Sequence, residues 1–426
     1  MPGPRLTGRG LVWPCAALFG LAASPALAED GAILDATDAL DFQPDPDRRA
    51  TEQRYGAGPI EADEPTVDVG GALRFNFSWN TWAGDDQFPS ASSFDVFRLD
   101  VGARYRELVL SAQYRFYAGY SMLQHGYLGT ELTDDNLAFR VGVTQVPFGI
   151  LPYASQSFFF SLLYYVGLED DYDLGVHFAT ELGPVDVQLA FFKNDETSYS
   201  GSSRDSARYS YDLVKTRPGE LAAAGIDEAR TGEEVNQTNL RLGWTLEHAE
   251  GFSTELGISG QIGQVLDPVL DATSLHWAAA GHVDGDYGWL VVQVQAGAYD
   301  VGQARRVERP ELVARGAYDA PYAVAAEAGF VVANVALEVP LDIWLLDSVT
   351  LYENYSRLFK AAAGFTDSEQ NVVGALLAAG PVYLYGDFAL GRNHPWLGPD
   401  YTTALGPGDP DAPWHLRFNT NLGWYF

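Results

Sequence analysis

The sequence predicts an all-β fold: a 16-stranded antiparallel transmembrane β-barrel over residues 66–426, with its third external loop folded inward. Three observations predict this fold. Apolar and polar residues alternate over strand-length stretches, the last alternating stretch ends on Phe426, and no run of eighteen apolar residues occurs after the first thirty positions. The third observation excludes a helical membrane protein.

The N-terminus predicts export. Arg5 and Arg9 precede an uncharged stretch, 11–27, and the small residues Ala26 and Ala28 stand just before the acidic Glu29. We therefore expect residues 1–28 to form a secretory signal peptide. Residues 29–65 are acidic, contain prolines and lack periodicity, which is typical of a flexible periplasmic leader. The single cysteine, Cys15, lies within the signal, and a lipoprotein interpretation is weaker because residues 11–14 are bulky.

Composition narrows the function. The chain carries 26 basic and 57 acidic residues, a net charge of −31, which repels nucleic acid. It contains no Gly-x-Ser-x-Gly, no His-Glu-x-x-His and no phosphate-binding glycine loop, and its 7 histidines are scattered. We therefore expect neither an enzyme nor a cofactor, although a barrel enzyme or an adhesin remains an alternative.

The first expected strand starts near residue 67, and every second side chain is apolar over about a dozen residues: Val67, Val69, Leu73, Phe75, Phe77 and Trp79. The same alternation recurs over 97–105, 108–116, 137–144 and 240–246. Strands of this length can cross a bilayer when they are tilted.

The last expected strand places its apolar residues on one face up to the chain end: Trp414, Leu416, Phe418, Leu422, Trp424 and Phe426. A soluble β-domain has no reason to finish in mid-strand on an aromatic residue. The ending looks like the terminal strand by which outer-membrane barrels are recognised, so Trp424 and Phe426 form a candidate signal for the barrel assembly machinery.

The number of strands follows from the side of the membrane on which the two chain ends lie. Both chain ends should lie in the periplasm, which requires an even number of strands with short turns inside and long loops outside. Tight turns are expected at 106–107, 183–184, 248–251, 284–286 and 380–381, and long polar loops at 194–233, 300–320 and 391–413. Without a strand between residues 117 and 137, the tight turn at 183–184 would lie on the outside, where long loops are expected. A weaker strand near 122–130 restores the even number, and the total becomes sixteen.

Residues 147–171 are the expected third external loop, and an exposed loop so rich in aromatics would promote aggregation. We expect it to fold into the barrel and narrow the pore; packing against a neighbouring subunit is the alternative. Its acidic end, 169–173, could hold a divalent cation or set the electrostatics of the pore mouth, and no metal site is predicted. The candidate constriction residues are Pro147, Phe148, Gly149, Phe159, Tyr164, Glu169, Asp170 and Asp171.

The same alternation directs several charged residues into the lumen. The predicted pore-lining residues are Arg74, Arg98, Arg104, Arg115, Arg140, Arg241, Asp100 and Asp173, and Arg417 faces the same way. Guanidinium groups offer successive donors to a passing anion. The acids could instead pair with them across strands, so a wall of mixed charge and an anion path are both open.

Three segments carry a family resemblance: 125–129 (HGYLG), 142–149 (GVTQVPFG) and 169–176 (EDDYDLGV). They resemble segments of the phosphate-selective porin O and P family, and the likeness covers about residues 66–195. The resemblance implies a 16-stranded homotrimeric channel with a constriction loop and anion-binding arginines and lysines. Residues 147–171, however, contain no Arg or Lys.

The expected function is that of an outer-membrane porin, embedded in outer-membrane lipid, through which small hydrophilic solutes and ions diffuse passively. The alternative is a channel specific for phosphate or another inorganic anion.

Overall fold

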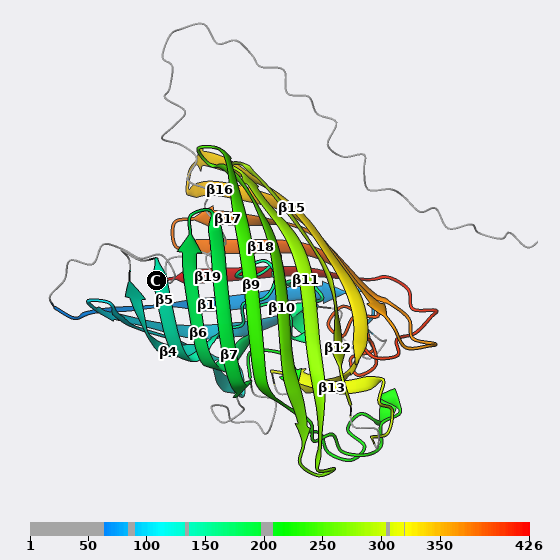
Figure 1. The fold of residues 1–426 in the computed structure, drawn as a ribbon. Coiled ribbons are helices and arrows are strands. Elements are labelled where there is room, and N and C mark those ends of the chain that lie inside the picture. Colours follow the sequence, from blue (N-terminus) through cyan, green and yellow to red (C-terminus); the bar gives the residue numbers. More distant parts are fainter. Residues whose placement is uncertain (1–63, 84–89, 133–135, 197–207, 304–306, 319) are drawn as a thin grey trace, which may run out of the picture. The chain divides into compact units, whose positions relative to one another are not determined.

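The computed structural model describes residues 64–83, 90–132, 136–196, 208–303, 307–318 and 320–426, all within one unit, Asp41–Phe426. The predicted signal peptide and all but the end of the predicted leader lie outside these residues. Sixteen strands form a closed barrel in which every neighbouring pair is antiparallel, so the predicted 16-stranded all-β barrel is confirmed (Figure 1).

The barrel strands are β1 (Thr66–Asn80), β2 (Ser90–Tyr105), β3 (Leu108–Phe116), β4 (Ser121–Leu132), β5 (Leu137–Gln145), β6 (Tyr172–Leu182), β7 (Val185–Asp195), β9 (Glu233–Ala249), β10 (Phe252–Asp267), β11 (Ala272–Tyr287), β12 (Leu290–Val301), β15 (Glu327–Ile343), β16 (Leu346–Lys360), β17 (Ser368–Ala379), β18 (Val382–Arg392) and β19 (His415–Tyr425). The described helical turns, Tyr164–Val166 and Ala222–Ala224, are short 3₁₀ segments. No helix in the described ranges is long and apolar enough to cross a membrane.

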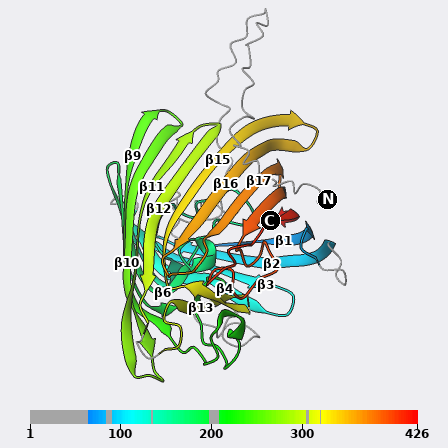
Figure 2. The ribbon, with the colours of Figure 1, turned by 90° about the vertical axis from the view of Figure 1, so that its right-hand side faces the viewer.

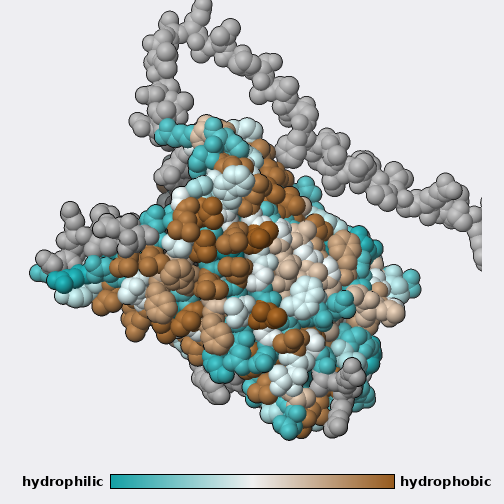
Figure 3. All heavy atoms as spheres, viewed as in Figure 1, coloured by the Kyte–Doolittle hydropathy of each residue, from teal (hydrophilic) through white to brown (hydrophobic). Residues whose placement is uncertain are grey.

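The alternation in sequence determines the two faces of the wall. On β10, Ile258 is 62% exposed on the outer face, while the adjacent Ser259 is 6% exposed on the other face. Figure 3 shows hydrophobic residues gathered over the strands on the face in view. The outer face is therefore apolar, and polar side chains point into the barrel.

The C-terminal strand closes the barrel. β19 pairs with both β18 and β1, and the backbone of Phe426 exchanges hydrogen bonds of 2.8 and 3.0 Å with Gly71. A side chain at Gly71 would lie 2.2 Å from the Arg98 carbonyl oxygen, so this closure requires a glycine.

Most expected boundaries agree with the structure. The strand required by parity is β4, and the turns at 106–107, 183–184 and 380–381 lie between strands. The turn expected at 284–286 is wrong. β11 continues to Tyr287, Asp284 pairs with Gln293, and the turn lies at 288–289, where Gly288 has a φ of 72°. The Asp-Gly-Asp sequence resembles a turn, but here it belongs to the polar end of a long strand.

The long connections form a second, three-stranded sheet. β8 (Asp212–Leu213), β13 (Leu312–Ala317) and β14 (Ala320–Ala325) pair in the order β14-β13-β8, and the barrel strands surround segments of these connections (Figure 2). The expectation of a polar loop over 300–320 is therefore corrected. Leu312 and Val313 are buried in this small sheet, where neither side of the strand faces water, so its sequence shows no clear alternation.

Candidate functional site

The segment between β5 and β6, residues 146–171, lies against the polar faces of distant barrel strands. Gly149 N donates to Ser259 Oγ of β10 at 2.9 Å, and Leu162 N donates to Ser356 Oγ of β16 at 3.0 Å. The Phe160 carbonyl oxygen accepts a 2.7 Å hydrogen bond from Gln370 Nε2 of β17. Side chains from three separate strands thus hold the backbone of this segment.

Arg241 fixes the beginning of the same segment. Its Nε donates to the Gly149 carbonyl oxygen at 2.7 Å, while its Nη1 lies 2.7 Å from Asp186 Oδ1. A second carboxylate, Glu255, is also within hydrogen-bond distance of Arg241. This predicted pore-lining arginine therefore has its donors engaged by the loop and by the wall.

Glu169, in the acidic end of the segment, accepts hydrogen bonds from the backbone of the same segment. Glu169 Oε1 accepts from Ala154 N at 3.0 Å, and its Oε2 accepts from the backbone N and the hydroxyl of Ser161. Burial raises the pKa of Glu169 to about 7 because the charged carboxylate is desolvated. Asp170 accepts from Tyr172 Oη at 3.0 Å and from Tyr209. Both acids thus have hydrogen-bond partners within the protein, and those of Glu169 belong to the segment itself.

Asp171 and Asp173, in contrast, meet an aspartate that is remote in sequence. One carboxylate oxygen from each, and one from Asp212 of β8, all lie within 4.8 Å of one another, and the three residues are buried. Such an oxygen set suits a divalent cation such as Ca²⁺, and protons offer the other route to neutralisation. Burial raises the pKa values of Asp171 and Asp212; the charge of Asp212 raises the pKa of Asp171 further, and Glu196 raises that of Asp212 further.

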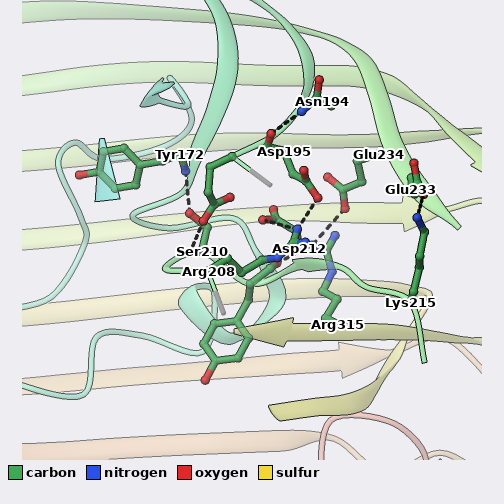
Figure 4. A network of polar contacts seen from close by, with 12 residues as sticks. Tyr172, Asn194, Asp195, Arg208, Ser210, Asp212, Lys215, Glu233, Glu234 and Arg315 are labelled. Atoms are coloured by element: carbon green, nitrogen blue, oxygen red, sulfur yellow. Dashed lines mark hydrogen bonds and ion pairs between the residues drawn. The ribbon is translucent and has the colours of Figure 1, made fainter. Parts of the chain in front are cut away.

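Two arginines balance part of this negative charge (Figure 4). Arg208 lies 3.3 Å from Asp212, and Arg315 lies 3.2 Å from Glu234 of β9. The network joins the small inner sheet to the barrel wall.

The remaining predicted pore-lining arginines lie beside carboxylates or amides. Arg98 is 2.9 Å from Asp100, and Arg104 and Arg140 share Glu131, with Arg140 at 3.6 Å. These pairs favour the mixed-charge interpretation for this part of the wall. They border a cavity of about 600 Å³ whose charged lining side chains are Asp68, Arg98, Asp100, Arg104 and Glu131.

A second cavity, of about 380 Å³, lies between segment 146–171 and the wall formed by β19, β1, β2 and β3. We call it the arginine–aromatic cavity. Its charged lining side chains, among the described residues, are Arg74, Arg115, Arg417 and Asp95, and fourteen aromatic residues complete most of the lining. Asp95 lies 2.9 Å from Arg74 Nε. The charged lining is therefore net positive in a chain that is strongly negative overall.

Each arginine of this cavity lies over an aromatic ring. The guanidinium carbon lies 6.0 Å from the Phe158 ring centroid for Arg74, 5.4 Å from that of Phe159 for Arg417, and 4.4 Å from that of Tyr209 for Arg115. Such contacts are favourable for a desolvated cation and restrict its position.

The predicted constriction residues not yet placed, Pro147, Phe148, Phe159 and Tyr164, are all buried. Trp424 and Phe426 lie on the outer face, 54% and 60% exposed. Sequence reasoning missed the tyrosines that reach the cavity from other loops, including Tyr209, Tyr211 and Tyr318. The alternation of residues 208–212 (RYSYD) was the available signal, but it lies within a stretch otherwise typical of a loop.

Comparisons with known proteins give a likeness in structure only. No protein-family model matches the chain, and no curated protein matches it. OmpT of Vibrio cholerae, in its trimer form, is 16% identical, with 85% of this chain and 100% of that chain covered and a TM-score of 0.51. The outer membrane channel DcaP of Acinetobacter baumannii is 14% identical, with 87% and 100% covered and a TM-score of 0.53.

An anion-selective porin from Comamonas acidovorans is 10% identical, with 85% of this chain and 100% of that chain covered and a TM-score of 0.53. At these identities the likeness carries information about the fold rather than about solutes. The chain thus has the fold of outer-membrane channels of the porin type.

Proposed function

We propose that the chain forms a passive channel in the cell outer membrane, through which small hydrophilic solutes and ions diffuse, with anions preferred. The observation that carries the proposal is the arginine–aromatic cavity, where three arginines and one aspartate are the charged lining side chains. In a chain of net charge −31, this local excess of positive charge is a feature of the site and not of the composition.

The barrel supports a lumen of useful size. Sixteen strands enclose more space than side chains from the wall alone can fill. An apolar outer face suits outer-membrane lipid, and the inner face is polar. These two properties and the fold shared with known channels support the membrane location and the passage of solutes.

The narrowing element is segment 146–171. Its hydrogen bonds to Ser259, Ser356 and Gln370 come from inward-pointing side chains, and Arg241 holds its first turn. These contacts favour a loop folded into the lumen over one that packs on a neighbouring subunit. Solutes are sieved by size at this level, and the arginines bias the sign of the ions that pass.

Export by residues 1–28, recognition of Trp424 and Phe426 by the assembly machinery, and assembly as a homotrimer belong to the same proposal. The trimer has support from the trimer form of OmpT of Vibrio cholerae, which shares the fold. Both side chains are exposed on the outer face of the folded barrel, where a binding partner can reach them.

A phosphate-specific channel is the second candidate, favoured by the three arginines. Planar-bilayer recordings separate the two candidates. We expect an ohmic chloride current that millimolar phosphate leaves largely unchanged. Block of the chloride current by phosphate would favour the specific channel, and the absence of any current would overturn both.

A further inference from the structure

We infer that the arginine–aromatic cavity preferentially binds small organic anions with an aromatic body, such as aryl carboxylates, and that Arg417 is the residue that binds the anionic group. This inference rests on the proposed channel function and names the class of solute that the narrow region favours.

Arg417 differs from Arg74, Arg98 and Arg241 in its partners. Arg74, Arg98 and Arg241 each lie within 3 Å of a carboxylate oxygen. Within the described ranges, no carboxylate lies at ion-pair distance from Arg417; its Nη2 donates to Asn419 Oδ1 at 3.4 Å, and its buried Nε has no hydrogen-bond partner. Arg417 is half-buried, and a partly desolvated guanidinium without a carboxylate is stabilised when an anion accompanies it.

Arg417 is also held in position for a ligand. Its guanidinium carbon lies over the Phe159 ring, 5.4 Å from the ring centroid, and this cation–π contact restricts its position. Phe159 belongs to segment 146–171, and Arg417 belongs to β19. The anion-binding group and the apolar surface that adjoins it are therefore supplied by the wall and by the loop, respectively.

The rest of the cavity favours an organic anion over an inorganic one. Most of its lining is aromatic, and several tyrosine hydroxyls already donate or accept within the protein: Tyr165 Oη donates to the Phe159 carbonyl oxygen at 2.9 Å, and Tyr209 donates to Asp170. Phosphate or chloride would exchange its water for ring faces that offer no donor. An aryl carboxylate places its charge on Arg417 and its ring against Phe158–Phe160.

The size of the cavity suits such a solute. Its volume, about 380 Å³, lies near the lower end of the range of about 300–1,000 Å³ that is usual for small-molecule pockets. A single aromatic ring with one or two substituents is the appropriate scale.

The test is block of chloride current by added anions, measured on the full purified protein in planar bilayers. Benzoate and acetate carry the same charge, and only benzoate has a ring. We expect benzoate to give half-maximal block at a concentration about tenfold lower than acetate, a ratio set by ring contacts. Equal block by benzoate and acetate, or stronger block by phosphate, would overturn the inference while leaving the channel in place.

Three variants locate the effect. Arg417→Gln should weaken block by benzoate at least tenfold, and Phe159→Leu should reduce the ratio of benzoate to acetate block. Arg357→Gln, whose ion pair with Asp367 lies outside the cavity, should change neither. If Arg417→Gln fails to fold, the ratio of benzoate to acetate block in the wild type and in Phe159→Leu still tests the inference. A wild-type protein that conducts no current refutes the proposed channel function itself.

Discussion

Arg241 of β9 donates a hydrogen bond of 2.7 Å from Nε to the carbonyl oxygen of Gly149. One side chain of the wall thus holds the first turn of segment 146–171, which we propose narrows the lumen, while the same guanidinium lies beside Asp186 and Glu255. Stability of the wall and position of the loop are coupled through this residue.

Arg241→Ala should therefore destabilise the barrel and displace the loop. The substitution leaves two partly buried carboxylates without their cation and removes a charge-assisted hydrogen bond. We therefore expect the free energy of unfolding to fall by about 2–3 kcal/mol. Single-channel conductance should rise because the loop end is released. Arg309→Ala, in a half-exposed pair with Glu311, is the control and should change stability by less than about 1 kcal/mol. Unchanged conductance in Arg241→Ala would show that this hydrogen bond does not hold the narrowing element.

Gly149→Ala probes the other partner. Gly149 has a φ of 69°, and a Cβ there would lie 2.4 Å from Gln295 Oε1, which accepts the Ile150 N–H at 2.9 Å. We expect a loss of about 1–3 kcal/mol of unfolding free energy and an altered conductance. Gly183→Ala is a matched control, since Gly183 has a φ of 62° but open space around its Cβ position. Equal losses in the two variants would mean that backbone strain, and not the contact with Gln295, explains the effect.

Stability should fall as pH rises from about 5 to 8. Burial raises the pKa of Glu169 to about 7, and that of Glu196 also to about 7. In this window the folded chain holds protons that the unfolded chain has released, so each group favours folding at low pH, and this contribution is lost as pH rises through its folded pKa. Melting temperatures measured in detergent across this pH range give the slope of stability against pH. Glu169→Gln should make this slope shallower, and the half-exposed control Glu311→Gln should not, because its pKa is lowered and it titrates below this window. A melting temperature that rises with pH would contradict the prediction.

Ile258→Arg tests the outward face. Ile258 is 62% exposed near the middle of β10, and an arginine facing lipid at the bilayer midplane costs about 2–4 kcal/mol. Ile258→Leu should be nearly neutral. The comparison uses equilibrium unfolding in phospholipid vesicles, and an arginine tolerated as well as leucine would mean that this face does not contact lipid.

The barrel could be predicted because its signal is local. Alternation between Ile258 and Ser259, repeated along a strand, reports which face meets lipid without knowledge of any partner strand. Even the weak β4 followed from parity. Turn chemistry was less reliable, since Asp284 and Asp286 are polar residues at the end of a long strand and not turn residues.

The site could be predicted only in part because its partners are remote in sequence. The sequence predicts that Arg98 and Arg417 point inward, but only the folded barrel places Asp100 beside the first and leaves the second without a carboxylate among the described residues. Likewise Asp212 reaches Asp171 through the small sheet built from two long connections, whose strands are too short to give a periodic signal.

The most direct test of the anion preference is the reversal potential of the purified channel in a tenfold KCl gradient. The excess of arginine at the narrow region predicts a potential of the sign given by chloride permeation, and a clear shift toward zero in Arg417→Gln. A potential of the opposite sign, or one that Arg417→Gln leaves unchanged, would contradict the proposed anion preference.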